Sequence, residues 1–103
     1  MRSLGQLLNA QLYMNDLLNF WNYVKNTWDL EEIEAAAEDF DFDISKLNKN
    51  HLKNLSSEDI IDLFGDVIDF VMDGFGIDNY GEIYDMLISA GIDEDRAHEI
   101  MDA

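Results

Sequence analysis

With 103 residues, 48% of them hydrophobic and 12% aromatic, the chain can bury the core of a single domain, which we place at residues 1–103. Its 23 acidic residues outnumber its 6 basic ones, and the net charge of −17 excludes direct binding to nucleic acid or to an anionic membrane and favours a basic protein partner. The chain has no cysteine, which excludes disulfides and thiolate metal sites and indicates a reducing compartment such as the cytoplasm.

A long first helix is predicted from Ser3, which can cap it, to about Asn26. Apolar side chains recur there at helical spacing, namely Leu7, Met14, Leu18, Trp21 and Trp28. Further leucines and aromatic residues widen this face beyond the needs of one core contact. We therefore expect the helix to form the centre of a bundle, and its surplus apolar surface leaves open a homodimer or a docked partner. No stretch is long and apolar enough to cross a membrane, so no membrane association is expected.

The next segment is strongly acidic. Asp29 and Glu32 have the spacing of a capping box and predict a second helix that extends to about Glu38. From Asp39 to Ile44 acidic and apolar residues alternate, which predicts extended backbone with carboxylates on one side and phenylalanine rings on the other. Because no second strand is evident, we expect a connector and not a sheet. The candidate partner-binding acids of this segment are Glu31, Glu34, Glu38, Asp39, Asp41 and Asp43.

Residues 45–55 carry three lysines and no acid, and they are predicted to form a short helix. Ser56, with Asp59 three residues later, begins a longer helix, which Gly74 is predicted to end in a left-handed cap. Five aspartates lie along this helix at three- and four-residue spacings, so they share one edge, while nearly all residues between them are apolar. We call this edge the aspartate row: Asp59, Asp62, Asp66, Asp69 and Asp73.

The aspartate row lowers the stability of the helix that carries it. Like charges at these spacings destabilise a helix by about 0.2–0.5 kcal/mol per pair, and aspartate is a poorer helix former than glutamate or lysine. An edge selected for stability would alternate glutamate with lysine. We therefore interpret the aspartate row as charge retained for binding a partner.

Two more helices complete the predicted fold. Asn79 is placed to cap a helix over residues 80–90 that Gly91 ends, and Asp93 is placed to cap a last short helix. The predicted fold class is therefore all-α, a compact bundle of five or six helices joined by short loops and built around the long first helix.

Several common site types do not fit the sequence. The alternation from Asp39 begins like a calcium-binding EF-hand loop, but Ile44 occupies the position that needs glycine and Asn50 the position that needs a bidentate glutamate. The two histidines lack the carboxylate spacing of a metal-binding bundle, and no catalytic triad or phosphate-binding loop is present. No serine lies in the Asp-Ser-Leu motif of acyl carrier proteins. We therefore expect no enzymatic activity, no metal and no cofactor.

In size, acidity, helical character and its aspartate row, the chain resembles the phage-encoded DNA-mimic inhibitors that block CRISPR effectors or restriction enzymes. The resemblance implies an inhibitor that acts in the host cytoplasm and occupies the cationic nucleic-acid groove of such an enzyme, where carboxylates replace phosphates as partners of arginine and lysine. The aspartate row offers one charge per roughly 5 Å, against one per about 3.4 Å on a DNA strand, so acids from residues 29–43 or from a dimer mate should supplement it. Phe75, Tyr80 and Tyr84 are expected to add apolar contacts at the rim.

Two other interpretations stay open. An acidic interaction module or an immunity-type subunit would bind a basic partner without imitating DNA or RNA. Competition separates this class from mimicry, because a module permits nucleic acid to occupy the partner at the same time. Surplus aspartate also suits adaptation to high salt, although the abundance of isoleucine, leucine and phenylalanine argues against it.

Overall fold

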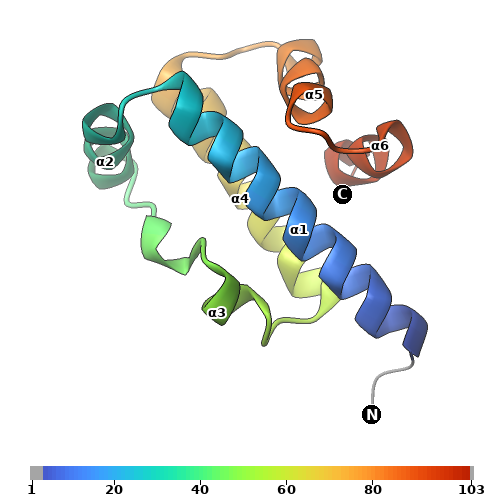
Figure 1. The fold of residues 1–103 in the computed structure, drawn as a ribbon. Coiled ribbons are helices and arrows are strands. Elements are labelled where there is room, and N and C mark those ends of the chain that lie inside the picture. Colours follow the sequence, from blue (N-terminus) through green and yellow to red (C-terminus); the bar gives the residue numbers. More distant parts are fainter. Residues whose placement is uncertain (1–3, 103) are drawn as a thin grey trace.

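The structure is a computed structural model that describes the backbone of residues 4–102 and the side chains of residues 10–102, so the predicted cap Ser3 lies outside the described residues. Within residues 4–102 it contains six α-helices, one 3-10 turn and no strand, and the all-α prediction is confirmed. The elements are α1 (Leu4–Thr27), α2 (Leu30–Asp39), the 3-10 turn η1 (Ile44–Lys46), α3 (Lys49–Leu52), α4 (Ser57–Phe75), α5 (Tyr80–Ser89) and α6 (Glu94–Asp102) (Figure 1). No helix in this range combines the length and the apolarity that crossing a bilayer requires.

The two longest helices, α1 and α4, form the centre of the molecule and lie side by side (Figure 1). They run in the same direction, because the aromatic pairs between them advance together along both helices. The ring centroids of Phe20 and Phe64 lie 5.6 Å apart, and those of Trp28 and Phe75 lie 4.2 Å apart. The segment from α2 to α3 returns the chain to the start of α4 (Figure 1). The C-terminal ends of α1 and α4 therefore lie at the same end of the molecule, beside α2.

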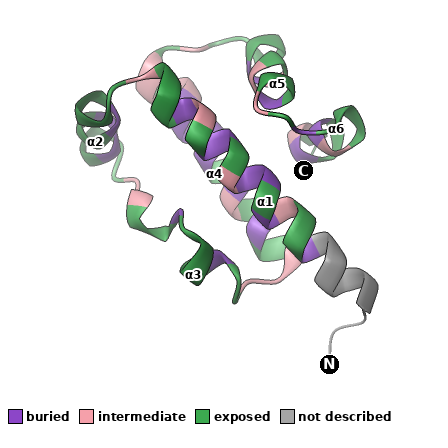
Figure 2. Ribbon diagram, viewed as in Figure 1, coloured by how far each residue is buried: buried purple, intermediate pink, exposed green. Residues whose placement is uncertain are grey.

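The core forms between these two helices and the shorter helices around them, and Figure 2 shows buried positions along both α1 and α4. The largest side chains with almost no exposed surface are Leu17, Phe20, Val24, Ile33, Leu52, Ile60, Phe64, Val67, Val71, Ile83 and Leu87. Of the first-helix residues singled out in the sequence, Met14 and Trp21 are buried in this core, and Leu18 and Trp28 are partly buried against it. The side chain of Leu7 lies outside the described residues.

Three of the predicted helix starts are capped as expected. The hydroxyl of Ser56 accepts a hydrogen bond from the backbone N–H of Asp59 at 3.2 Å, and the side-chain oxygen of Asn79 accepts one from Gly81 at 2.7 Å. At the start of α6, the carboxylate of Asp93 accepts a hydrogen bond from the backbone N–H of Asp95 at 3.2 Å.

Asp29 precedes α2, but its side chain makes no capping hydrogen bond, so the predicted capping box is not formed. The start of α2 is instead marked by the extended backbone of Asp29.

The predicted end of α4 is wrong. The helix continues past Gly74 to Phe75, and Gly76, with a φ of 71°, adopts the left-handed conformation that ends it. Gly74 has a packing role, because a Cβ atom there would lie 3.2 Å from the Cβ of Ala36 in α2. The missing side chain therefore lets α2 lie close against the last turn of α4. Gly91, with a φ of 94°, follows α5 as predicted.

Two polar contacts attach α6 to α1. Asp16, a buried acid of α1, forms an ion pair with Arg96 of α6. One turn away on each helix, the hydroxyl of Tyr13 donates a hydrogen bond to the carboxylate of Glu99. Burial, together with this hydrogen bond, raises the pKa of Tyr13 to about 12. The C-terminal helix is thus held to α1 by charge and hydrogen bonding in addition to apolar packing.

Candidate functional site

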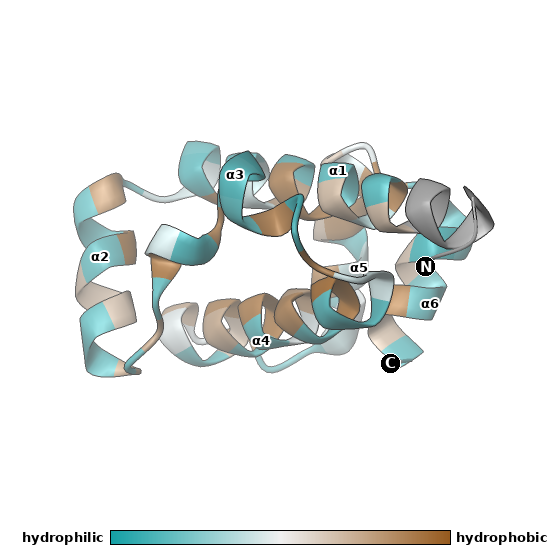
Figure 3. Cartoon of the chain, turned by 90° about the horizontal axis from the view of Figure 1, so that it is seen from below, coloured by the Kyte–Doolittle hydropathy of each residue, from teal (hydrophilic) through white to brown (hydrophobic). Residues whose placement is uncertain are grey.

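All five side chains of the aspartate row are exposed along α4. The residues between them include Ile60, Phe64 and Val67, which are buried in the core. Figure 3 shows α4 as a mainly hydrophobic helix along one side of the molecule. Because the apolar face of α4 is held against the core, the rotation of the helix and hence the direction of its acidic edge are fixed.

The C-terminal half of the aspartate row borders a shallow groove with a volume of about 330 Å³. Part of its wall comes from α4 and part from the residues that follow α2. We call it the Phe40 groove, and it is lined by Phe40, Asp41, Phe42, Asp66, Asp69, Phe70 and Asp73. Asp59 and Asp62 lie on the earlier turns of α4, outside this lining. The groove therefore brings four carboxylates together with three aromatic rings.

The residues that follow α2 turn sharply, so the predicted extended connector is wrong. The backbone N–H of Phe42 donates to the carbonyl of Ala37 at 2.8 Å, and that of Asp41 donates to the carbonyl of Glu38 at 3.4 Å, which is the pattern of a Schellman cap. Asp41 holds the position that glycine usually occupies, with a φ of 54°. Aspartate tolerates this left-handed conformation better than most residues with a side chain. The cap places Asp41 beside the C-terminal half of the aspartate row.

The two phenylalanines of this turn have opposite environments. Phe42 stacks on Phe70, with ring centroids 4.6 Å apart and the ring planes inclined by 6°. Phe70 is only 4% exposed and also contacts Trp21 and Phe75 in the core. Phe40, in contrast, is 51% exposed. Phe42 therefore anchors the turn to the core, while Phe40 stands in solvent at the groove.

The sequence did not reveal Phe40 as a site residue. Two-residue alternation assigns it to the same face as Phe42, and helical spacing assigns it to the same face as Ile33 and Ala37, so both patterns predict burial. The helix ends at the preceding residue, and the left-handed conformation of Asp41 redirects the chain before either pattern can place the ring inside.

The other acids predicted for partner binding lie outside the lining of the Phe40 groove. Four of them are exposed on α2: Glu31, Glu34, Glu38 and Asp39. Asp43 caps η1, where its carboxylate accepts hydrogen bonds from the backbone N–H of Ser45 at 3.0 Å and from its hydroxyl at 2.5 Å. The hydroxyl and N–H of Ser45 hold the pKa of Asp43 below its ordinary value. Within the acidic segment 29–43, Asp41 is therefore the acid that lines the groove with the aspartate row.

The three aromatic residues expected at the rim have different positions. Phe75 is half-buried and stacks on Trp28, so it belongs to the core. Tyr84 is half-buried, and its ring lies 4.9 Å from that of His98. Tyr80 is 63% exposed and lines a small hollow together with Asp69. Tyr80 is thus the expected rim residue that does lie next to the aspartate row.

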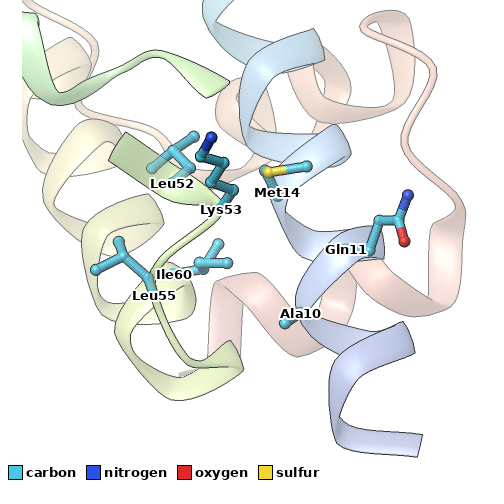
Figure 4. Close-up of a pocket in the computed structure, with 7 residues that line it drawn as sticks. All are labelled: Ala10, Gln11, Met14, Leu52, Lys53, Leu55 and Ile60. Atoms are coloured by element: carbon cyan, nitrogen blue, oxygen red, sulfur yellow. The ribbon is translucent and has the colours of Figure 1, made fainter. Parts of the chain in front are cut away.

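A third hollow, of about 310 Å³, lies between α1, the residues around α3 and the start of α4 (Figure 4). Its lining is mainly apolar and consists of Ala10, Gln11, Met14, Leu52, Lys53, Leu55 and Ile60. Lys53 is the one ionisable side chain among these residues. The hollow therefore has no pair of groups for acid–base chemistry.

Within the described side chains, no group of three or more histidine, aspartate and glutamate residues is placed to hold a metal ion. Comparisons with protein-family models, with characterised proteins and with solved structures find no match. The aspartate row and the Phe40 groove are therefore the features from which a function can be inferred.

Proposed function

We propose that the protein inhibits an enzyme of a host nucleic-acid defence system, a CRISPR effector or a restriction enzyme, by occupying the cationic groove that binds DNA or RNA. The observation that carries the proposal is the exposure of all five side chains of the aspartate row on one edge of a helix whose apolar face is buried. A fixed line of negative charge is the property that nucleic-acid-binding grooves recognise without regard to sequence.

The rigidity of α4 supports this proposal. The helix has 19 residues and packs along α1, and short aspartate side chains lose little rotamer freedom when they bind. Its charges follow one another at roughly 5 Å, compared with about 3.4 Å for the phosphates of a DNA strand. Asp41 adds a carboxylate beside the C-terminal half of the row, which brings the local charge density closer to that of a phosphate backbone.

The proposed mechanism is competitive exclusion of nucleic acid. Carboxylates of the aspartate row pair with arginines and lysines of the enzyme that otherwise contact phosphates. The net charge of −17 attracts a cationic groove at long range and accelerates association, and salt weakens this effect because it screens the charges. The mechanism needs no catalytic residue, metal or cofactor in the inhibitor.

Exposure of acids on other elements favours a second candidate, an acidic interaction module or immunity-type subunit. All acids of the chain except Asp16 are exposed, and they lie on α2, α5 and α6 as well as on α4. A module that binds a basic partner uses charge in any of these directions, whereas a mimic needs it along one edge. A module also leaves the nucleic acid of its partner in place.

A displacement assay tests the proposal. Labelled target DNA, or guide RNA with target DNA, is bound to each member of a panel of CRISPR effectors and restriction enzymes, and the protein is titrated in at low and moderate salt. We expect displacement from at least one enzyme, with weaker inhibition as salt rises. The variant D62N/D66N/D69N should inhibit about tenfold more weakly or worse, because three charged contacts are lost.

The matched control removes the same charge elsewhere. E82Q/D85N/D102N neutralises three exposed acids of α5 and α6 and has the same net charge as the row variant. It should inhibit within about twofold of the unchanged protein, since screened charges outside the interface contribute little. Equal loss in both variants would show that net charge alone matters. A complex that contains the protein, the enzyme and the nucleic acid together would reject mimicry in favour of the module.

A further inference from the structure

The Phe40 groove presents an aromatic ring that the fold does not use. Phe40 is 51% exposed, while the other five phenylalanines of the chain are buried or half-buried. Its neighbour Phe42 already fastens the turn to the core by stacking on Phe70. The stability of the fold therefore gives no reason for a phenylalanine at position 40, and a large exposed ring beside a hollow is typical of a contact surface.

The surroundings of this ring select a cation. Asp41, Asp66, Asp69 and Asp73 line the groove, and none of its seven lining residues is basic. Two helices also end there, since α2 stops one residue before Phe40 and α4 stops shortly after Asp73. The negative ends of both helix dipoles add to the carboxylate charge. An occupant that suits the groove carries positive charge and an apolar or planar surface.

The geometry of the rings distinguishes between kinds of cation. The ring of Phe42 lies parallel to that of Phe70 and is covered by it on one face, and Phe70 is buried, so Phe40 offers the one well-exposed ring. A quaternary ammonium needs several aromatic walls and cannot donate hydrogen bonds to carboxylates. A lysine ammonium is a compact, strongly hydrated charge that gains little from a ring. A guanidinium is planar, stacks on one ring and donates to two carboxylates at once.

We propose that the Phe40 groove binds one arginine side chain of the basic partner, with the guanidinium stacked on Phe40 and hydrogen-bonded to carboxylates of Asp41 and the aspartate row. This inference rests on the proposed function and adds the side chain that the inhibitor recognises. Asp59 and Asp62, on the earlier turns of the row, lie outside the lining of the groove, so we expect the C-terminal half of the row to be the part that distinguishes arginine from lysine.

Peptide binding to the isolated protein tests this assignment. The probes are acetylated and amidated pentapeptides Gly-Gly-X-Gly-Gly, where X is arginine, lysine or trimethyllysine, titrated into the isotope-labelled full chain and followed by NMR. We expect the arginine peptide to bind roughly three- to tenfold more tightly than the lysine peptide and to shift the signals of Asp66, Asp69 and Asp73. Phe40→Leu keeps apolar volume but removes the ring, and it should reduce arginine binding to the lysine level.

The control variant is Ile88→Ala, which removes a large exposed apolar side chain of α5 outside the groove and should leave arginine binding unchanged. Equal binding of arginine and lysine, or arginine binding unaffected by Phe40→Leu, would overturn the assignment. Tightest binding of trimethyllysine would also overturn it, in favour of an aromatic cage. Because this assay contains no enzyme, failure to displace nucleic acid from the enzyme panel would reject the proposed function while leaving the peptide result as it stands.

Discussion

The carboxylate of Asp16 in α1 is held by two nitrogens of Arg96 in α6, eighty residues further along the chain. Nε of Arg96 lies 2.7 Å from Oδ2 of Asp16, and a terminal guanidinium nitrogen lies 3.3 Å from Oδ1. Asp16 is 3% exposed, and the pairing raises the pKa of Arg96 above its ordinary value. The one buried acid of this highly charged chain is thus matched by an arginine from the opposite end of the sequence.

Removal of the arginine should be costly. Arg96→Gln leaves a buried carboxylate without its cation, and we expect the free energy of unfolding to fall by about 3 kcal/mol in urea denaturation. Asp16→Asn combined with Arg96→Gln should recover part of this loss, because it removes the unpaired charge. Asp102→Asn, an exposed acid of α6, should change stability by less than about 0.5 kcal/mol. If the double variant is no more stable than Arg96→Gln, the ion pair between Asp16 and Arg96 is not what stabilises the contact between α1 and α6.

The hydrogen bond between Tyr13 and Glu99 should appear as an alkaline transition. Tyr13 keeps its proton up to about pH 12 in the folded protein, whereas an unfolded tyrosine loses it near 10.0. Its contribution to stability is therefore complete below pH 10 and is lost as the pH rises through 12. Spectrophotometric titration of the phenolates should show a component near pH 12 that is absent from Tyr13→Phe. If that component persists in Tyr13→Phe, it belongs to another residue. Tyr84→Phe is the comparison variant, because burial, together with the nearby carboxylate of Glu94, raises the pKa of Tyr84 as well.

Neutralising the aspartate row should stabilise the fold. D62N/D66N/D69N removes all four neighbouring like-charge pairs of the row, so we expect a gain of about 1–2 kcal/mol in the free energy of unfolding at low salt. The control E82Q/D85N/D102N relieves fewer such pairs and should gain less. Added salt should shrink the difference between the two, because it screens exposed charges. A loss of stability in the row variant would show that its carboxylates make favourable contacts within the fold.

The conformation of Asp41 also has a measurable cost. Its left-handed φ of 54° is unfavourable for a residue with a side chain by about 1 kcal/mol, so Asp41→Gly should stabilise the protein by up to that amount. Asp41→Ala should destabilise it, since alanine has neither the freedom of glycine nor the local hydrogen bonding of aspartate. Thermal unfolding of the two variants measures both effects. If glycine gives no gain, the Asp41 side chain contributes to stability elsewhere.

The two glycines inside α4 should respond differently to alanine. A Cβ atom at Gly65 would meet nothing within 4 Å, so Gly65→Ala should gain about 0.5–1 kcal/mol from helix propensity. At Gly74 the same change forces α2 to move, because the Cβ of Ala36 lies only 3.2 Å away. We therefore expect Gly74→Ala to gain nothing or to destabilise the protein. Equal gains at both positions would show that α2 moves away at no cost.

Much of the fold could be predicted because its signals are local. Helical spacing and the caps at Ser56 and Asn79 act within one or two turns, so the sequence alone locates the starts of α4 and α5. The exposure of the aspartate row follows from the same spacing. The end of α5 is also signalled locally, because Gly91 adopts the left-handed conformation there and this conformation costs glycine little free energy.

What could not be predicted depends on distant parts of the chain. Either Gly74 or Gly76 can end a helix, and the close approach of α2 decides that Gly74 serves packing while Gly76 forms the cap. The burial of Asp16 requires Arg96, which lies eighty residues away. Phe40 is exposed only because the preceding helix ends in a left-handed turn at Asp41. The spacing of apolar residues along the sequence does not predict such a turn.

Because Phe42 packs against the core while Phe40 is exposed, the protein is a convenient scaffold for directed selection. Phe70 and Phe42 join the Phe40 groove to the core through their ring contacts, so these two positions tolerate little change. Positions 40 and 41 stand outside that stacked pair, one exposed and the other in a turn that glycine also accepts. A library randomised at these two adjacent codons would vary ligand preference while the helical framework beneath it stays intact.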